Sequence, residues 1–443
     1  MTLEFCLCII EQEQMFGILK KRKIKMPNRY YLCIDMKTFY ASVECAERGL
    51  NPFETPLAVA DPQRGKNALC LAVSPKLKKF GVKNRCRISE IPENIKYIIA
   101  RPRMQLYIDY CAEIYSIYLD YFSPDDIHTY SIDESFIDVT GYLRSMKTDA
   151  LSLAKKLMNE IANRLFIPST VGIGTNLYLA KVALDITAKH TVSHIGFLNE
   201  ELYKKTLWDH IPLTDFWMIG ANTAKRLSSR GIFTMRDIAL APQEILYKLF
   251  GIDAELMIDH SLGKESCLME DIKNYNSKSR SVSLSQILPR DYSYKEIETI
   301  IREMTLSGTY ELTKRKVIAG KINLYIGYSW NYEGSYRKGI KITAPTALYS
   351  ELLPYAIRLY EGIKNKNAPI RRVGISFGGI QSEDCYGYDL FSDFDEIRRE
   401  RELNKTVLSL YGKFGKNSLL KGTDFLESAM QIERNKLIGG HNA

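Results

Sequence analysis

The sequence lacks the patterns that usually mark a structural metal, a disulfide framework or a membrane span. Its nine cysteines form no Cys-x-x-Cys pair, and its six histidines are not spaced with them as zinc ligands would be. No apolar run approaches the length that crosses a bilayer, and the apolar start has no basic leading region. We therefore expect neither a membrane span nor a signal peptide. The cysteines are typical of buried residues in a reducing cytoplasm.

Negative charge is also scarce relative to positive charge. The formal net charge is +9 and the sequence pI is about 8.9. This excess suits a polyanionic partner such as nucleic acid, although an anionic membrane surface or an ordinary basic protein would fit the charge equally well. With 443 residues, 45% of them hydrophobic, the chain is long enough for more than one domain.

The first half of the chain alternates strand-like and helix-like segments. β-Branched and aromatic runs predict strands, and apolar residues at helical spacing predict helices. The expected strands are residues 30–35, two within 128–139 that meet at a tight turn, and 169–174, and the expected helices are residues 38–48, 149–165 and about 176–188. This alternation indicates an α/β layer with a mixed sheet.

After about residue 195 the pattern changes to short helices. Residues 217–239 predict a helix, a glycine-containing turn and another helix. A polar and basic stretch near residues 272–280 indicates a linker, and strands separated by helix-like stretches follow it. We therefore expect a second, smaller α/β domain, followed from about residue 381 by a charged segment with helical spacing.

Three carboxylates are expected at strand ends or strand turns, namely Asp35 and the adjacent pair Asp133 and Glu134. Two like charges about 4 Å apart repel by about 4 kcal/mol at an effective dielectric constant near 20. Mg²⁺ would relieve this repulsion, because it accepts oxygen ligands and typically keeps places for water and substrate phosphates. Each acid taken alone is more often a turn residue or a helix cap, so the assignment depends on the surrounding motifs.

Those motifs closely resemble the Y-family DNA polymerases. IDMKTFYASVE (34–44) and YSIDESFIDVT (130–140) resemble the paired signature of the family, and KKFGVK (78–83), LDITAKH (184–190) and residues 399–422 continue the resemblance. The chain is most similar to the UmuC-like branch, the catalytic subunit type of bacterial polymerase V, particularly in its Gram-positive forms. The resemblance runs from about residue 29 to the C-terminus.

The resemblance implies roles for particular residues. Asp35 and Asp133 would bind two Mg²⁺ ions, Glu134 would hold the ion that activates the primer hydroxyl, and the backbone carbonyl of Met36 would complete a coordination shell. The residues implied in nucleotide binding are Phe39, Tyr40, Ser74, Lys78 and Lys189, with Tyr40 at the steric gate beneath the sugar. Gly220 and Lys225, in the helix–hairpin–helix segment, would contact DNA phosphates, which carry no sequence information.

Three positions depart from the family pattern. Lys37 occupies a position where many members carry Asp, although the UmuC-like branch also lacks an acid there. Pro75 replaces a Tyr that contacts the triphosphate in many relatives, which leaves Ser74 as a weak substitute. Met218 replaces the usual glycine of the hairpin turn and leaves Gly220 as the supporting glycine.

The architecture implied is an α+β right-hand polymerase. It would have a mixed-sheet palm, small fingers, a helical thumb and a separate α/β little-finger domain. The expected division is an N-terminal extension (1–28), palm (29–40 and 105–195), fingers (41–104), thumb (196–272), linker (273–276), little finger (277–380) and C-terminal tail (381–443). The implied activity is low-fidelity, damage-tolerant addition of deoxynucleotides to a primer, in the cytoplasm, as part of a DNA damage response.

Two rival functions and one further partner follow from the sequence. An ATPase is suggested by Gly415–Lys416, but Asn417 stands where the Walker pattern needs Ser or Thr. A non-catalytic DNA-binding repair scaffold would explain the basic charge, but not the three acids. Primer–template DNA and deoxynucleoside triphosphates are the expected ligands. Leu390 and Phe391, in GYDLFSD (387–393), resemble a segment that binds the sliding clamp.

Overall fold

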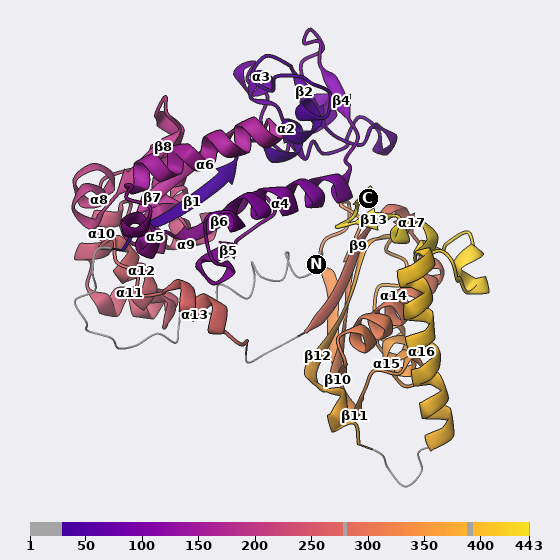
Figure 1. Ribbon diagram of the computed structural model, residues 1–443. Coiled ribbons are helices and arrows are strands. Elements are labelled where there is room, and N and C mark those ends of the chain that lie inside the picture. Colours follow the sequence, from indigo (N-terminus) through magenta and orange to yellow (C-terminus); the bar gives the residue numbers. More distant parts are fainter. Residues whose placement is uncertain (1–28, 278–280, 388–392, 443) are drawn as a thin grey trace. The chain divides into compact units, whose positions relative to one another are not determined.

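The first strand of the chain, β1 (Tyr31–Met36), lies at the centre of a five-stranded sheet (Figure 1). The strand order is β5-β6-β1-β7-β8. The other strands are β5 (Ile127–Thr129), β6 (Glu134–Asp138), β7 (Ser169–Gly174) and β8 (Ile195–Leu198). β1 pairs antiparallel with β6 and β7, whereas β7 and β8 are parallel. The prediction of a mixed sheet is therefore confirmed.

Alternate residues of β1 face opposite sides of the sheet, as the pleat of a strand requires. Tyr31 and Cys33 pack in one buried cluster with Phe136 of β6 and with apolar residues of α7 (Leu177–Val182). α6 (Ala150–Leu165) packs against β7 and beside α4 (Met104–Leu119). Helices thus cover the sheet, and β1 is buried along almost its whole length.

Two glycines of β7 let α7 approach the sheet more closely than any side chain would allow. A Cβ added to Gly172 would lie 2.1 Å from the Ala180 carbonyl oxygen, and one added to Gly174 would lie 2.1 Å from the Ala180 nitrogen. Both neighbours are backbone atoms of α7, which cannot rotate out of the way. The VGIG sequence therefore fixes the height of α7 above the sheet.

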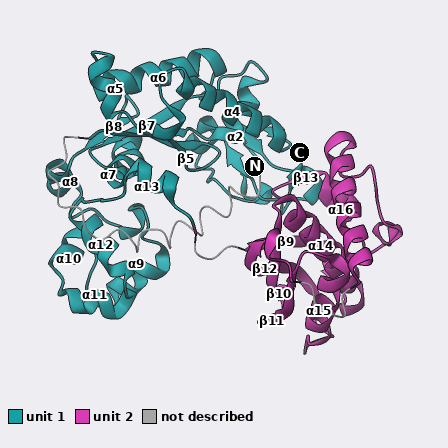
Figure 2. Cartoon of the chain, turned by 60° about the horizontal axis from the view of Figure 1, so that its bottom comes forward, with its two compact units in different colours: residues 1–276, 441–443 teal, residues 277–440 magenta. Residues whose placement is uncertain are grey.

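The structure is a computed structural model that describes residues 29–277, 281–387 and 393–442. Leu390, Phe391 and the expected extension 1–28 lie outside the described residues. The chain divides into residues 1–276 with 441–443, and residues 277–440 (Figure 2). No helix within the described ranges is both long and apolar enough to cross a membrane.

The rest of the first unit consists of a small sheet and a group of short helices. α2 (Phe39–Ala46) leads from β1 to a three-stranded sheet of order β3-β2-β4. These strands are β2 (Leu57–Val59), β3 (Ala72–Val73) and β4 (Ile98–Ala100). The helices after β8 are α8 (Glu200–Leu207), α9 (Ala221–Ser228), α10 (Met235–Leu240), α11 (Gln243–Phe250), α12 (Asp253–Ser261) and α13 (Met269–Asn274).

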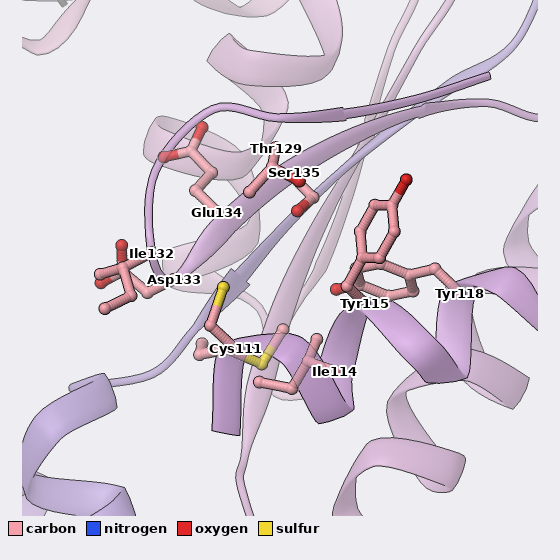
Figure 3. A pocket seen from close by; sticks show the side chains of 10 residues that line it. Cys111, Ile114, Tyr115, Tyr118, Thr129, Ile132, Asp133, Glu134 and Ser135 are labelled. Carbon is pink, nitrogen blue, oxygen red and sulfur yellow. The ribbon is translucent and has the colours of Figure 1, made fainter. Parts of the chain in front are cut away.

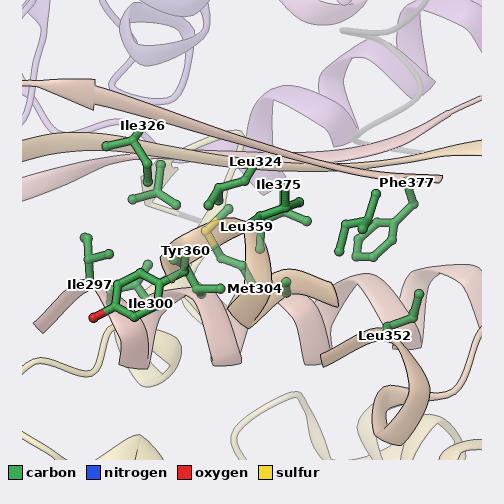
Figure 4. Close-up of a cluster of buried hydrophobic side chains, with 14 of the residues drawn as sticks. Ile297, Ile300, Met304, Leu324, Ile326, Leu352, Leu359, Tyr360, Ile375 and Phe377 are labelled. Carbon is green, nitrogen blue, oxygen red and sulfur yellow. The ribbon is translucent and has the colours of Figure 1, made fainter. Parts of the chain in front are cut away.

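The second unit is a four-stranded antiparallel sheet packed against helices. The strand order is β11-β10-β12-β9, with β9 (Val282–Tyr292), β10 (Val317–Tyr328), β11 (Ser335–Thr346) and β12 (Ile370–Ser382). α14 (Tyr294–Lys314) and α15 (Tyr349–Glu361) bury its apolar core, in which Met304, Leu324 and Phe377 are almost fully enclosed (Figure 4).

The structure differs from the expected boundaries at two places. The expected linker begins at residue 273, but residues 273 and 274 still belong to α13. Lys273 Nζ donates to the Pro124 carbonyl at 2.8 Å. The expected tail contains α16 (Phe394–Phe414), which packs against α14, and α17 (Gln431–Asn435). The buried carboxylate of Glu303 in α14 accepts the backbone N–H of Met430 at 3.1 Å and that of Gln431 at 3.2 Å. These segments belong to the second unit.

The close approach of α7 to β7 gives a direct test of the fold. We predict that Gly172→Ala lowers the free energy of unfolding by about 3 kcal/mol, because overpacking against backbone atoms cannot be relieved by a rotamer change. Gly141→Ala is the matched control, since a Cβ there meets nothing within 4 Å and the residue lies in a helix. Urea unfolding followed by circular dichroism measures both, and equal stabilities would contradict the packing.

Candidate active site

The register of β1 and β6 places the three predicted carboxylates at one end of the sheet. Asp35 is directly opposite Glu134 across the antiparallel pair. Asp133 immediately precedes β6, and its carbonyl accepts the backbone N–H of Met36 at 2.9 Å. Residues directly opposite in such a pair point to the same face of the sheet. Asp35 and Glu134 therefore share the face that α7 covers.

The electrostatics at this end of the sheet favour a bound cation. Burial raises the pKa of Asp35 well above its usual range, and the neighbouring Asp133 and Glu134 raise that pKa further. Carboxylate oxygens are the ligands that Mg²⁺ prefers, so the donor set fits this ion. In the conformation described, however, no three acidic, histidine or cysteine side chains of residues 29–277, 281–387 and 393–442 form a group that could hold a metal.

The carboxylate of Glu134 is held by other side chains. One oxygen accepts Lys181 Nζ at 2.7 Å, and the other accepts the thiol of Cys33 at 3.1 Å. Figure 3 shows the carboxylates of Asp133 and Glu134 diverging beside a pocket at the turn before β6. Met36 and Cys111, which belongs to α4, are among the residues that line this pocket.

Lys181 is the central cation of this cluster, and its role was not predicted from the sequence. Its ammonium group is buried and also lies 3.1 Å from Asp185 Oδ2. Burial alone would lower the pKa of Lys181, but Glu134, Cys33 and Asp185 together outweigh burial and raise that pKa above its usual range. Lys189, the predicted triphosphate contact, lies 3.2 Å from Asp185 Oδ1. The spacing of Lys181, Asp185 and Lys189, each four residues apart, was a signal that could have revealed this network.

A second network supports Tyr40, the residue predicted at the steric gate. The Tyr40 ring stacks on Tyr107 of α4 with ring centroids 4.5 Å apart, and the buried Phe39 packs against both rings. Tyr107 in turn donates its hydroxyl to the fully buried carboxylate of Glu44 at 2.8 Å. Glu44 also pairs with Arg48 and Arg103. Tyr40 thus rests on a buried platform that sequence reasoning missed.

The predicted basic contacts lie near the same carboxylates. Partial burial lowers the pKa of Lys78, and the nearby carboxylate of Asp35 opposes that shift. Lys37 lies 3.3 Å from His194 Nδ1. Lys78 and Lys37 therefore bring positive charge to the region where a triphosphate was predicted.

The structure argues against the nucleotide contact predicted for Ser74. Its side chain is fully buried, and its hydroxyl donates to the Thr55 carbonyl at 2.7 Å. The same oxygen accepts the backbone N–H groups of Leu57 and Leu77. Ser74 is the N-cap of α3 (Pro75–Lys79) and has no remaining capacity to bind a ligand.

The two predicted DNA contacts lie at opposite ends of the short helix α9. Gly220 is the N-cap of this helix, and Lys225 lies in its last turn. The positive φ of the turn, 71°, falls on Met218, the position at which the resemblance led us to expect glycine. Gly220 itself has an ordinary negative φ, so the expectation that it replaces the missing glycine is not supported. Its place at a helix N-terminus still presents backbone N–H groups to a phosphate.

Comparison with known proteins agrees with this geometry. Residues 34–185 match the impB/mucB/samB family, and residues 279–390 match the C-terminal domain of that family. A Bacillus subtilis (strain 168) protein named for UV-damage repair, UvrX, is 31% identical over 95% of this chain and 99% of its own length. DNA polymerase IV 2 of the same strain is 28% identical over 94% of this chain and 99% of its own length.

A solved structure shares the fold. The Y-family DNA polymerase chimera Dbh-Dpo4(243-245)-Dbh superposes with a TM-score of 0.64 at 22% identity, covering 80% of this chain and 99% of the chimera. The fold class is thus that of the Y-family DNA polymerases, with the right-hand architecture expected above. Within that class, the chain belongs to the impB/mucB/samB family, the UmuC-like branch.

Proposed function

We propose that this chain is a template-directed DNA polymerase that adds deoxynucleotides to a primer 3′-hydroxyl and copies across damaged bases with low fidelity. Its family membership supports this function, and its relatives are named as DNA polymerases IV and for UV-damage repair. The observation that carries the proposal is the register that sets Asp35 opposite Glu134, with Asp133 beside them. A DNA-binding scaffold in the cytoplasm would gain nothing from three acids that repel both one another and DNA.

The reaction transfers a nucleotidyl group. The primer 3′-oxygen forms a bond to the α-phosphorus, the bond from that phosphorus to the β-phosphate oxygen breaks, and pyrophosphate leaves. Y-family polymerases depend on divalent metal ions. Two Mg²⁺ ions would be held by Asp35 and Asp133, and Glu134 and the Met36 carbonyl would each complete the oxygen ligands of one ion. When bound, such ions activate the hydroxyl and offset charge on the phosphates.

The remaining residues position the substrates. Lys78 and Lys189 provide cations for the triphosphate, and the Tyr40 ring, supported by Tyr107, lies beneath the sugar. The N-terminus of α9 at Gly220, with Lys225, binds the phosphates of the primer–template. Positioning and charge neutralisation are the main sources of rate enhancement in phosphoryl transfer.

Removing one acid tests the polymerase assignment. We predict that Asp133→Ala abolishes nucleotide addition but leaves primer–template affinity largely intact, because that affinity comes mainly from basic contacts to phosphate. The same result is expected for Glu134→Ala. Primer extension and fluorescence anisotropy with labelled primer–template measure the two properties separately. Near-normal extension by both variants would refute the site and favour a DNA-binding scaffold.

Tyr40 gives a test of sugar selection. We predict that Tyr40→Ala folds and adds deoxynucleotides but accepts ribonucleotides more readily by roughly ten- to hundredfold, since an unsatisfied 2′-hydroxyl beneath the ring costs about 1–3 kcal/mol. The measurement is the ratio of kcat/KM for matched deoxy- and ribonucleotides. Tyr40→Phe keeps the ring and should keep the wild-type ratio. An unchanged ratio in an active Tyr40→Ala protein would exclude this role.

The sliding clamp is a further proposed partner. Two adjacent large apolar residues, Leu390 and Phe391, stand in a polar stretch of sequence that resembles a clamp-binding segment. We predict that replacing both by Ala lowers the affinity for the bacterial sliding clamp at least tenfold, as measured by surface plasmon resonance, while distributive primer extension is unchanged. Equal clamp affinity of the wild-type and variant proteins would remove this partner.

A further inference from the structure

A row of alternating charges connects the predicted triphosphate contact to the predicted metal ligand. It runs from Lys189 through Asp185 and Lys181 to Glu134, with nitrogen–oxygen distances of 3.2, 3.1 and 2.7 Å. The Lys189 side chain is 56% exposed and that of Asp185 26%, whereas the side chains of Lys181 and Glu134 are each 9% exposed. The row therefore leads from the surface to the buried end of the sheet.

The local backbone makes this row possible. Lys181 lies in α7, and the helix continues as a wide π-type turn over Ala183–Thr187 and then as a tighter turn over Ala188–His190. The three charged residues, Lys181, Asp185 and Lys189, therefore lie on successive turns. π-Type turns are uncommon and are frequent at functional sites.

Each inner member of the row is shared between two partners. Lys181 contacts both Glu134 and Asp185, so these two carboxylates compete for one ammonium group. Asp185 uses Oδ2 for Lys181 and Oδ1 for Lys189. While Lys189 neutralises Asp185, the attraction of Asp185 for Lys181 is reduced, and Lys181 stays with Glu134.

We propose that this row is an ion-pair relay through which triphosphate binding releases Glu134 for metal binding. When a triphosphate pairs with Lys189, Asp185 loses its ion pair with Lys189 and keeps Lys181 as its cationic partner. Lys181 then moves toward Asp185. Glu134 then keeps only the weak thiol hydrogen bond of Cys33 and can turn toward Asp35. Lys181 and Asp185 are positioning residues in this scheme, which rests on the proposed polymerase function.

The relay predicts a particular pattern of metal affinities in the absence of nucleotide and DNA. Mn²⁺ serves as the probe, and electron paramagnetic resonance of the unbound ion gives its dissociation constant. Asp185→Asn should weaken Mn²⁺ binding because Lys181 keeps Glu134, and Lys189→Ala should tighten it because Asp185 attracts Lys181 more strongly. Both substituted side chains are partly exposed, so we expect these variants to fold.

Removing a negative or a positive charge near the site would by itself weaken or tighten Mn²⁺ binding in the same directions. The variant that carries both substitutions therefore distinguishes the relay from a simple charge effect. If Lys189 acts through Asp185, Lys189→Ala should have little effect in the Asp185→Asn background, which is a coupling of about threefold or more. Lys78→Ala is the matched control, since Lys78 lies near Asp35 but is not one of the two ammonium groups, Lys181 and Lys189, that pair with Asp185. Its effect on Mn²⁺ affinity should be the same in both backgrounds.

A second measurement adds the nucleotide itself. An exchange-inert rhodium(III) complex of a deoxynucleoside triphosphate carries its own metal, so added Mn²⁺ reports on the protein carboxylates. The complex should tighten Mn²⁺ binding at least about threefold more in the wild type than in Asp185→Asn. Additive effects in the double variant, or equal tightening in both proteins, would overturn the relay. Primer extension by the wild type would then still support the polymerase function.

Discussion

The contact between α7 and β7 is the constraint on which the charged site depends. Because Gly172 and Gly174 have no side chains, the backbone of α7 lies directly on the sheet. At this height the ammonium group of Lys181 reaches Glu134 across the end of β6. A helix held one side chain further away would leave Glu134 as a buried carboxylate without a strong counter-charge, which is a costly arrangement. The glycines of β7 are thus needed both for the packing of α7 on the sheet and for the charge compensation of Glu134 by Lys181.

This arrangement also balances charge around a group of acidic side chains. Asp35, Asp133 and Glu134 lie at one end of the sheet, and the charges of Asp133 and Glu134 increase the cost of ionising Asp35. Lys181 supplies an internal positive charge there, with Asp185 and Lys189 as successive partners. The acids at this end of the sheet are therefore partly balanced by cations of the chain itself.

Sequence patterns predicted the backbone better than the side-chain partners. Alternation of strand-like and helix-like segments was enough to predict the mixed sheet. The pairing of β1 with β6 was not predicted, because it joins strands that are far apart in sequence and local periodicity does not specify it. The contact of Lys181 with Glu134 was missed because Lys181 lies in an apolar run that looks like an ordinary core helix. Ser74 was assigned to the nucleotide although Ser followed by Pro is itself a helix-start signal. The end of α13 was missed because its polar residues resemble a linker. The roles of Asp35, Tyr40 and Lys78 stay predictions, since geometry alone does not test them.

The anchoring of α17 by Glu303 has a consequence for how the protein is made. Glu303 lies in the first helix of the second unit, and the backbone groups that it binds are 127 and 128 residues further along the chain. Contacts of such long sequence separation form late, because the intervening chain must be ordered first. During synthesis α14 leaves the ribosome before residues 430 and 431 do. The second unit can therefore close only after these residues have emerged, whereas the sheet around β1 is complete in sequence by β8 and can form earlier.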